Sequence, residues 1–253
     1  LVSGVLIAFN VLLCQVWAER NLRFPLLGAA VLVLAGAHGL GYALYGEPED
    51  PAGDGFTVGL YQSNYPQQMK WDPEFQETMV EMAILQSELI TKNAPVDLFV
   101  WPEALIMRDF RTPRILGRIQ DFVADTGIPL FTGTARQDHA SGASYNASVL
   151  LDREGAVEIY DKVKLAPFGE YIPLESYLSF ARELGASGGI TAGDTARVFP
   201  VGDRQLGPLI CFEVLFGPLA DERRQLGADF LVVVTNLGWF GQSNVLSQEL
   251  EIA

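Results

Sequence analysis

Two long apolar runs, separated by a short charged connector, open this sequence. Leu1–Trp17 is almost wholly apolar and is interrupted only by Asn10 and Gln15, and Phe24–Tyr45 forms the second run. A helix of about 20 apolar residues is long enough to cross the hydrocarbon core of a bilayer. Because neither run has a substantial polar face, we predict two transmembrane helices within residues 1–45, and we expect the first to lack its beginning.

The connector between the runs predicts their orientation. Residues 18–23 include both Arg20 and Arg23, and arginine is enriched in loops on the cytoplasmic side of membranes. A cytoplasmic loop near 18–23 would place everything after the second helix on the opposite side. A signal peptide is disfavoured because the second run ends without a small-residue cleavage site. A buried core hairpin is the other alternative, and two runs this long and this apolar argue against it.

A composition change separates this region from the rest of the chain. Residues 46–55 (GEPEDPAGDG) are rich in Gly, Pro and Asp and predict a linker, followed by a second domain over residues 56–253. Residues 1–45 carry a net charge of +1, so the remainder carries −15 of the formal −14. So acidic a domain argues against nucleic acid as a partner. Because the sequence stops within a regular pattern, we expect this domain to be C-terminally incomplete.

Beyond the linker, apolar runs typical of strands alternate with helical patterns, which predicts a layered α/β domain with a buried sheet. Asp72 and Pro73 supply an N-cap and a first-position proline for one helix. Asp152–Gly155 predicts a hairpin turn. The predicted strands are 56–61, 96–100, 128–135, 146–151, 156–160, 205–211 and 230–235, and the predicted helices are 72–90, 113–126 and 214–227.

Three residues with reactive side chains follow predicted strands, where α/β folds usually place their chemistry. They are Glu103, Lys162 and Cys211. Each has an ordinary explanation on its own, since a lone cysteine after a strand is often a packing residue and a Glu or Lys there is often solvated. With only His38 and His139 in the chain, a histidine base for the thiol is improbable.

Together these three residues form a chemically complete set. A thiol at a helix N-terminus has its thiolate favoured by the helix dipole and by a nearby ammonium. A carboxylate can take the thiol proton, and a lysine can stabilise the oxyanion of a tetrahedral intermediate. Cys14 lies in an apolar run, and no paired metal-ligand spacing occurs, so we expect no disulfide, no metal and no organic cofactor.

The segments around these residues resemble the three signature blocks of the nitrilase superfamily, in its order. The blocks are Trp101–Glu103, Tyr160–Glu170 and Ile210–Glu213. An extension at Pro167–Glu175, the segment Asn236–Gly241 and the preceding membrane spans narrow the resemblance to the apolipoprotein N-acyltransferase family. The resemblance covers essentially the whole chain, and it implies a nitrilase-like αββα sandwich preceded by transmembrane helices.

The resemblance also implies roles for individual residues. It makes Glu103 the general base, Lys162 the oxyanion-stabilising lysine and Cys211 the nucleophile. Lys164 is the rival lysine, but Lys162 stands eight residues before Glu170, as the family pattern requires. Four further residues match positions that support the centre or lie near substrate, namely Trp71, Glu170, Glu213 and Trp239.

Some parts of this interpretation leave alternatives open. Trp71 could be a packed aromatic at a helix start, and Glu213 could be a first-turn residue favoured by the helix dipole. Phe212 stands where the family often has tyrosine, and Leu237 where aspartate is frequent. Residues 174–184 followed by a glycine-rich segment suit a mobile arm over a lipid entrance, or an ordinary surface insertion.

The activity that the resemblance implies is a two-step acyl transfer in the bacterial inner membrane, with the catalytic domain on the periplasmic side. A phospholipid would donate the acyl chain to Cys211 as a thioester, and a diacylglyceryl-cysteine lipoprotein would accept it on its N-terminal amine. A membrane-tethered amidohydrolase of the same superfamily is one alternative, with water as the acceptor. A catalytically inactive lipid- or lipoprotein-binding module is the other.

Overall fold

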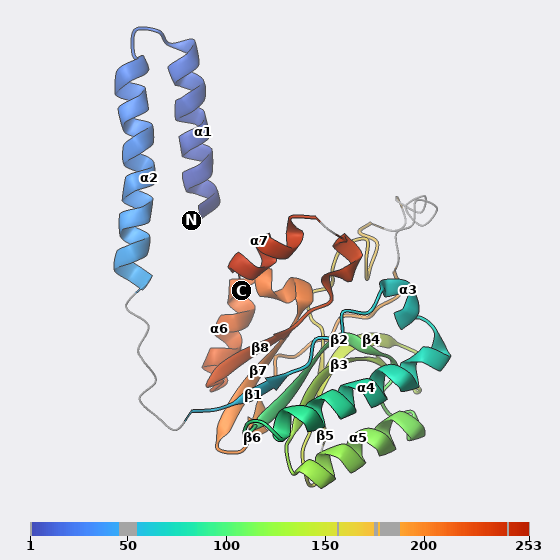
Figure 1. Cartoon of the computed structure of the whole chain (residues 1–253). Coiled ribbons are helices and arrows are strands. Elements are labelled where there is room, and N and C mark those ends of the chain that lie inside the picture. Colours follow the sequence, from blue (N-terminus) through green and yellow to red (C-terminus); the bar gives the residue numbers. More distant parts are fainter. Residues whose placement is uncertain are drawn as a thin grey trace. The chain divides into compact units, whose positions relative to one another are not determined.

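The computed structural model describes residues 2–45, 55–155, 157–174, 177, 188–241 and 243–252. By its internal contacts the chain divides into two compact units, Leu1–Gly55 and Phe56–Ala253 (Figure 1).

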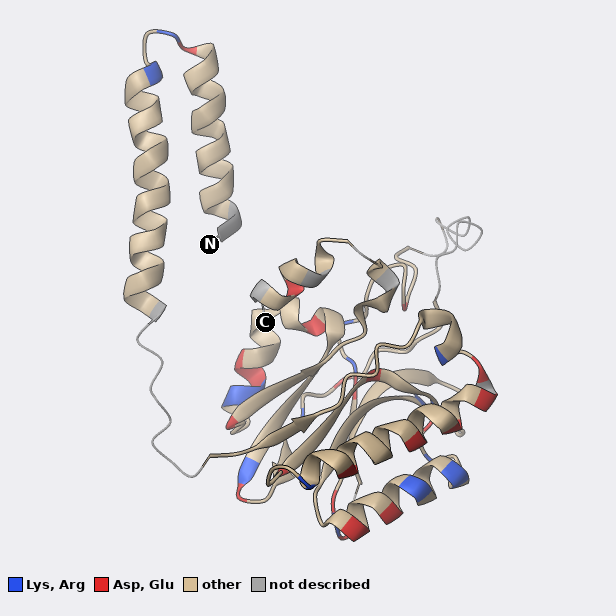
Figure 2. Ribbon diagram, in the orientation of Figure 1, with Lys and Arg blue, Asp and Glu red and all other residues tan. Residues whose placement is uncertain are grey.

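The first unit is a hairpin of two apolar helices, α1 (Val2–Ala18) and α2 (Arg23–Tyr45), which pack against each other. Residues Arg23–Leu44 of α2 are long and apolar enough to cross a membrane, whereas α1 is a shorter apolar helix. Figure 2 shows that the charged residues of this unit gather at the connector between the helices. Two membrane-spanning helices therefore stay a prediction, which the length and composition of α2 support.

The side chains of the hairpin also suit an apolar environment. Trp17 is 89% exposed and Tyr42 is 85% exposed, so two large aromatic side chains near helix ends are open to the surroundings. Two polar side chains bond to the backbone of their own helix, since Asn10 Nδ2 donates to Leu6 O at 2.9 Å and His38 Nδ1 lies 3.0 Å from Leu34 O. Internal satisfaction of this kind is what a helix needs where water is absent.

The second unit contains two β-sheets. The first has the order β1-β2-β3-β4-β5, in which β1, β2 and β3 are parallel and β4 and β5 continue antiparallel. The second has the order β6-β7-β8, with β7 and β8 parallel. The strands are β1 (Val58–Leu60), β2 (Leu98–Asp109), β3 (Leu130–Gln137), β4 (Ser144–Leu151), β5 (Val157–Asp161), β6 (Phe199–Val201), β7 (Arg204–Ile210) and β8 (Phe230–Val234).

Helices flank and connect these sheets. Two of them, η2 and η3, are short 3₁₀ helices that follow β7 and β8. The helices are α3 (Gln67–Lys70), α4 (Pro73–Thr91), α5 (Pro113–Thr126), η2 (Cys211–Leu215), α6 (Gly217–Gln225), η3 (Leu237–Phe240) and α7 (Val245–Ile252).

The alternation of side chains along β2 shows how the layers are stacked. Phe99 and Trp101 join a core cluster with residues of α4 and α5, whereas Leu98 and Val100 join a second cluster with residues of β6, β7 and β8. Successive strand residues point to opposite faces of a sheet. The first sheet therefore has helices on one face and the second sheet on the other (Figure 1). With α6 against β7 the domain is an αββα sandwich, which confirms the predicted fold class.

Several local predictions are confirmed. The helix predicted over 113–126 is α5, which the left-handed Gly127 (φ +69°) ends. The side chain of Asp72 caps α4 by accepting from Glu74 N at 3.0 Å. Gly155 (φ +81°) lies in the turn of the β4–β5 hairpin. These signals are local, so the sequence carries them in full.

Other boundaries differ from the prediction. The predicted helix 214–227 is divided into η2 and α6, because Phe216 adopts a non-helical conformation (φ −110°, ψ 85°) and Pro218 lies in the first turn of α6. The strand predicted over 96–100 is β2, which begins at Leu98 and continues to Asp109. The strand predicted over 56–61 is the shorter β1, which covers only Val58–Leu60. Of the arm predicted over 174–184, residues 175–176 and 178–184 lie outside the described residues.

Candidate active site

Glu103 lies inside β2, at a bulge, and not after the end of a strand as predicted. Trp101 pairs with Thr132 and Ile106 with Thr134, so residues 102–105 of β2 oppose only Gly133 of β3. A bulge of this kind bends a strand and re-aims its side chains. Ala104 takes up part of the bend with φ +57°, a conformation that non-glycine residues rarely adopt. The carboxylate of Glu103 is thereby buried, and the residue is only 6% exposed.

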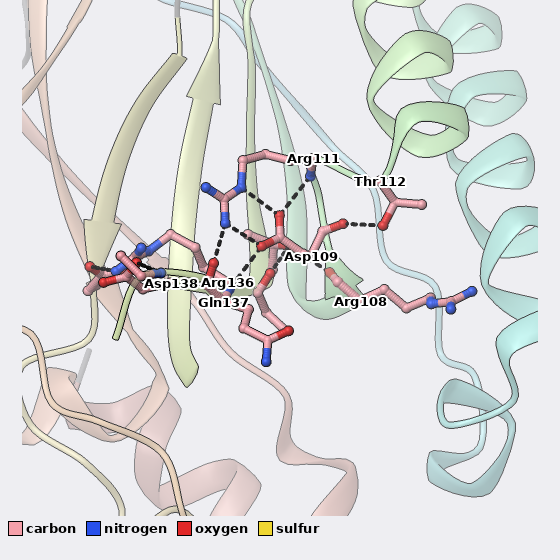
Figure 3. Close-up of polar contacts among 11 residues, drawn as sticks. Arg108, Asp109, Arg111, Thr112, Arg136, Gln137 and Asp138 are labelled. Carbon is pink, nitrogen blue, oxygen red and sulfur yellow. Dashed lines mark hydrogen bonds and ion pairs between the residues drawn. The ribbon is translucent and has the colours of Figure 1, made fainter. Parts of the chain in front are cut away.

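Beyond the bulge, the end of β2 is held by a polar network that Figure 3 shows. The Arg111 guanidinium donates to both carboxylate oxygens of Asp109, and it also donates to the carbonyl oxygen of Gln137. The backbone N–H of Gln137 donates back to Asp109 Oδ2 at 2.9 Å. Because Gln137 belongs to β3, the network fixes the two neighbouring strands together after the irregular segment.

Lys162 directly follows β5 and is 1% exposed. Its Nζ lies 2.9 Å from Glu170 Oε2 and 3.8 Å from Glu103 Oε1. Its carbonyl oxygen accepts from Gly193 N at 2.8 Å, and Arg136 anchors the preceding Asp161 through two hydrogen bonds. Burial alone lowers the pKa of Lys162, but Glu103, Glu170 and the Cys211 thiol together raise it above its ordinary value. The ammonium is therefore a permanent positive charge at neutral pH.

Asn146 joins the two carboxylates. Its side-chain Nδ2 donates to Glu103 Oε1 at 2.8 Å and to Glu170 Oε1 at 2.6 Å. Glu170 is fixed further by the backbone N–H of Ala166, which donates to Oε2 at 2.7 Å. Lys162 and Asn146 thus hold both carboxylates in place, and buried charges that are paired and hydrogen-bonded in this way keep a single geometry.

Cys211 stands at the junction between β7 and η2 with φ +49°, so it is strained as a non-glycine residue. Its side chain is partly buried. Burial, followed by the charge of Glu103, raises the pKa of the Cys211 thiol to about 12, although Lys162 and a hydrogen bond with Thr235 oppose the shift. The stabilisation expected from a helix dipole is outweighed here, in part because η2 has only five residues. The resting thiol is therefore protonated and needs a base.

Glu213 fastens the strand end before Cys211 to the loop after Lys162. The residue is fully buried, and its Oε2 accepts from Ile210 N at 2.9 Å. Its Oε1 accepts from Val163 N at 2.8 Å and from Lys164 N at 3.0 Å. The Tyr160 hydroxyl also donates to Oε1, and the buried Arg223 donates to that hydroxyl.

The second oxygen of Glu103 contacts the second sheet. Asn236, which follows β8 by two residues, donates its backbone N–H to Glu103 Oε2 at 2.7 Å. The Asn236 side chain in turn accepts from Lys70 Nζ at 2.8 Å and donates to Gln67 Oε1 at 3.1 Å. Burial raises the pKa of Glu103 above its ordinary value, and Lys162 and the hydrogen bonds from Asn146 and Asn236 partly offset that shift.

The structure brings the three predicted reactive residues together. Glu103 and Lys162 are an ion pair, and both are near enough to Cys211 to shift the pKa of its thiol. Glu170 lies within the same network, and Glu213 forms an adjacent one that accepts from Val163 N. The side chain of the rival Lys164 is solvent-exposed.

The structure describes the side chain of one of the two predicted tryptophans, Trp71. Trp71 is 57% exposed and follows α3 directly after the buried Lys70. Trp239 belongs to η3, and its side chain lies outside the described part of the structure.

Sequence reasoning missed three residues of these networks, namely Asn146, Lys70 and Arg223. Asn146 starts the predicted strand 146–151, and a polar residue that carries a side-chain amide ahead of the apolar Val149–Leu151 is a usable signal. The sequence around Lys70 and Arg223 contains no such signal, because their burial depends on contacts with residues more than 60 positions away.

This arrangement suits acyl-group chemistry. It provides a thiol nucleophile, a buried carboxylate whose raised pKa brings it nearer to neutral pH, and a fixed ammonium. The Lys162 ammonium donates to Glu170 Oε1 at 3.1 Å and is ion-paired with Glu170 Oε2 at 2.9 Å. An ammonium has three N–H donors, so it can also serve a negatively charged oxygen that develops beside Cys211.

Comparison with known sequences gives consistent matches. Residues 57–252 match the carbon-nitrogen hydrolase family. The chain is 33% identical over 202 residues to an apolipoprotein N-acyltransferase of Geobacter metallireducens, covering 78% of this chain and 39% of that protein. It is also 33% identical over 262 residues to an apolipoprotein N-acyltransferase of Pseudomonas putida, covering 100% of this chain and 50% of that protein. The chain thus spans half or less of the length of these curated relatives.

Solved structures match the same fold. An amidase of the nitrilase superfamily from Nesterenkonia superposes with a TM-score of 0.55 at 19% identity, covering 80% of this chain and 73% of that chain. A carbon-nitrogen hydrolase from Helicobacter pylori superposes with a TM-score of 0.54 at 16% identity, covering 78% of this chain and 66% of that chain. At these identities the similarity concerns the fold alone.

Proposed function

The chain belongs to the carbon-nitrogen hydrolase family, and we propose that it is the catalytic part of a membrane-anchored N-acyltransferase. In this proposal it moves an acyl chain from a phospholipid, through a thioester on Cys211, to the N-terminal amine of a diacylglyceryl-cysteine lipoprotein. The names of the curated relatives support the acceptor class, since they are apolipoprotein N-acyltransferases.

One observation carries the chemical part of the proposal. A partly buried cysteine with a strained backbone stands beside a buried lysine whose Nζ is 2.9 Å from Glu170 and 3.8 Å from Glu103. A merely structural ion pair would not require a thiol at that position. Such a cluster of nucleophile, base and cation inside a folded domain is typical of covalent acyl-transfer catalysis.

In the first half-reaction the Cys211 sulfur attacks the ester carbonyl of the phospholipid while Glu103 accepts the thiol proton. The negative charge on the carbonyl oxygen develops beside the Lys162 ammonium, which stabilises the tetrahedral intermediate. The intermediate collapses with cleavage of the carbon–oxygen bond. The leaving alkoxide takes the proton from Glu103, so a lyso-phospholipid departs and a thioester remains on Cys211.

In the second half-reaction the α-amine of the lipoprotein attacks the thioester carbonyl. Glu103, ionised again, removes a proton from the attacking amine, and Lys162 again faces the oxyanion. Cleavage of the carbon–sulfur bond leaves an amide on the acceptor, and the proton returns from Glu103 to the Cys211 sulfur. The cycle is balanced without any redox partner.

The apolar helix hairpin supports a membrane setting for these substrates. We propose that α1 and α2 anchor the chain in the bacterial inner membrane, with the connector near 18–23 on the cytoplasmic side and the catalytic domain on the periplasmic side. Both substrates carry acyl chains, so an anchored enzyme meets them without their transfer into water.

The proposal is tested by product analysis. The full chain in detergent is incubated with a phospholipid carrying a labelled acyl chain and with a synthetic diacylglyceryl-cysteine peptide. We expect a labelled amide on the peptide, and none when the peptide amine is acetylated. Release of labelled free fatty acid with no amide would indicate an amidohydrolase-type enzyme that uses water as acceptor. Binding of lipid with neither product would indicate a binding module.

A further inference from the structure

Lys70 is a second buried lysine beside the candidate centre, and the acyl-transfer steps above give it no task. The residue is 5% exposed at the end of the short helix α3, and its Nζ donates to the neutral side-chain amide of Asn236 at 2.8 Å. Burying an ammonium is costly unless the charge is used or compensated. A methionine or leucine would fill the same space without the desolvation cost of an ammonium, so packing alone does not explain a lysine here.

The group that Lys70 holds is also a ligand of Glu103. Asn236 donates its backbone N–H to Glu103 Oε2 at 2.7 Å, while its side-chain Oδ1 accepts from Lys70. Asn236 follows the last strand of the second sheet, and Glu103 belongs to the first sheet. This hydrogen bond therefore crosses from one sheet to the other, and Cys211 stands at the end of β7, next to β8.

Lys70 is itself fixed to the strand that carries Glu103. The side-chain Nε2 of Gln76 donates to the carbonyl oxygen of Lys70 at 2.7 Å, and Gln76 Oε1 accepts from Met107 N in β2 at 2.7 Å. Gln76 is 1% exposed, so this link is shielded from water. Lys70 thus connects β2 with the segment after β8 through buried hydrogen bonds on both sides.

We propose that Lys70 is a positioning residue that fixes Glu103 relative to Cys211, by anchoring Asn236 against Glu103 Oε2 and by placing a cation near that carboxylate. The inference rests on the proposed function in one respect, namely that Glu103 is the base for the Cys211 thiol. It requires neither a phospholipid donor nor a lipoprotein acceptor.

The charges around Glu103 define the expected pH effect. Glu103 faces Lys162 and Glu170 across the ion-pair cluster, Lys70 from α3, and Cys211 from η2. Burial lowers the pKa of Lys70, and Glu103 partly restores it, so these two groups interact electrostatically. Loss of the Lys70 charge would remove one cation that favours ionised Glu103. The pKa of Glu103 would then rise further, and the acid limb of its activity would move to higher pH.

The experiment measures alkylation of Cys211 by iodoacetamide from pH 5 to 9 in the full chain in detergent, with peptide mass spectrometry to separate Cys211 from Cys14. This readout reports on the Glu103–Cys211 pair and does not depend on acyl transfer. For Lys70→Met we expect the rate at pH 7 to fall by about 10- to 100-fold, the scale that misplacement of a reacting group by about 1 Å produces. We also expect the acid limb to shift upward.

The control is Lys92→Met, which removes an exposed lysine at the end of α4 and should leave rate and pH profile unchanged. A purely structural role for Lys70 would lower the melting temperature but not move the acid limb. If folded Lys70→Met has the parent rate and profile, the proposal is wrong.

Two milder variants keep the proposal testable if Lys70→Met does not fold. Lys70→Arg retains the charge and a donor, whereas Lys70→Gln retains only a donor. We expect the acid limb to shift in Lys70→Gln and to stay near the parent position in Lys70→Arg. If the pH profiles of Cys211 alkylation coincide in the two variants, the electrostatic part of the proposal is wrong. If both variants also react at the parent rate, the whole proposal is wrong. Normal alkylation behaviour in the parent chain without acyl transfer would contradict only the proposed function.

Discussion

The Lys162 ammonium lies 3.8 Å from the nearer carboxylate oxygen of Glu103, although 58 residues and three different strands separate the two in the chain. Both side chains are almost fully buried, at 1% and 6% exposure of the residues. A buried pair of this kind seldom adds stability by itself, because desolvation offsets the attraction between the charges. Its geometry is the one that the proposed chemistry at Cys211 requires.

Removal of the Lys162 charge tests the oxyanion role. We expect Lys162→Met to lose acylation of Cys211 by a phospholipid, because no other cation faces the acyl carbonyl in the proposed mechanism. Glu103 and Glu170 would also lose their shared counter-ion, so stability should fall by roughly 3–5 kcal/mol. Intact-mass spectrometry follows acylation, and urea denaturation follows stability. The control is Lys164→Met, which removes the exposed rival side chain and should be acylated at a rate within about twofold of the parent. Full acylation of Cys211 in Lys162→Met would refute the oxyanion role of Lys162.

The pH dependence of acylation tests the role of Glu103. Burial raises the pKa of Glu103 above its ordinary value, so the carboxylate is ionised and basic only above that raised pKa. Acylation should therefore decline as the pH falls, with a midpoint above the ordinary value of 4.5, and Glu103→Gln should slow it at every pH. We expect a loss of about 10²- to 10⁴-fold, the usual contribution of a general base. An undiminished rate in Glu103→Gln would exclude it as the base.

Gly133 tests whether the bulge in β2 positions Glu103. A Cβ at Gly133 would approach Glu103 Cα to 2.6 Å, and backbone cannot move aside as a flexible side chain can. We expect Gly133→Ala to destabilise the domain by about 1–3 kcal/mol and to slow acylation. Gly117→Ala is the matched control, because nothing lies within 4 Å of the new Cβ on α5. That variant should gain roughly 0.5–1 kcal/mol, and equal behaviour of the two variants would contradict a constrained bulge.

The carboxyl group of Asp109 should make the unfolding free energy of the domain depend on pH in acid. Burial alone would raise its pKa, but hydrogen bonds from Arg111 and from the Gln137 backbone lower it to about 2 from an ordinary 3.8. A carboxyl pKa that is lower in the folded state stabilises the fold above the unfolded value, and this contribution is lost as the pH falls through the folded value. Because Arg111 is 41% exposed and solvent screens the pair, we expect about 1–2 kcal/mol.

The measurement is urea denaturation of the parent and of Asp109→Asn between pH 7 and pH 2. The difference in unfolding free energy should be constant from pH 7 to about 5 and shrink towards pH 2. The exposed Asp125→Asn variant, on α5, serves as the control for a lost carboxylate. If the difference in unfolding free energy between the parent and Asp109→Asn stays constant down to pH 2, the charge of Asp109 does not contribute to stability.

The fold was predictable where local signals determine it. The N-cap at Asp72, the helix over 113–126 and the hairpin at Gly155 each depend on neighbouring residues, and all three predictions are confirmed. Short elements such as β6 and α3 were missed because three or four residues give no periodicity. The division of the predicted helix 214–227 lies at Phe216, whose non-helical conformation precedes Pro218 in the first turn of α6, and the apolar helical pattern alone does not mark it.

The sequence predicted the three reactive residues of the site, but not the buried residues that hold them in position. Strand-end chemistry and family-like motifs indicated Glu103, Lys162 and Cys211, and the structure brings the three together. The position of Glu103 inside a strand was not predicted, because the apolar run 96–100 gave the strand and the bulge carries β2 on to Asp109. The burial of Lys70 and its contact with Asn236, 166 positions away, emerge only from the tertiary structure.

Formation of a thioester on Cys211 is tested most directly by intact-mass spectrometry of the full chain after incubation with phospholipid in detergent. We expect the parent protein to gain the mass of one acyl chain and neutral hydroxylamine to remove it, and we expect Cys14→Ala to behave in the same way. Cys211→Ala should gain no such mass. An acyl adduct that persists in Cys211→Ala, or none in the folded parent protein, would contradict the account.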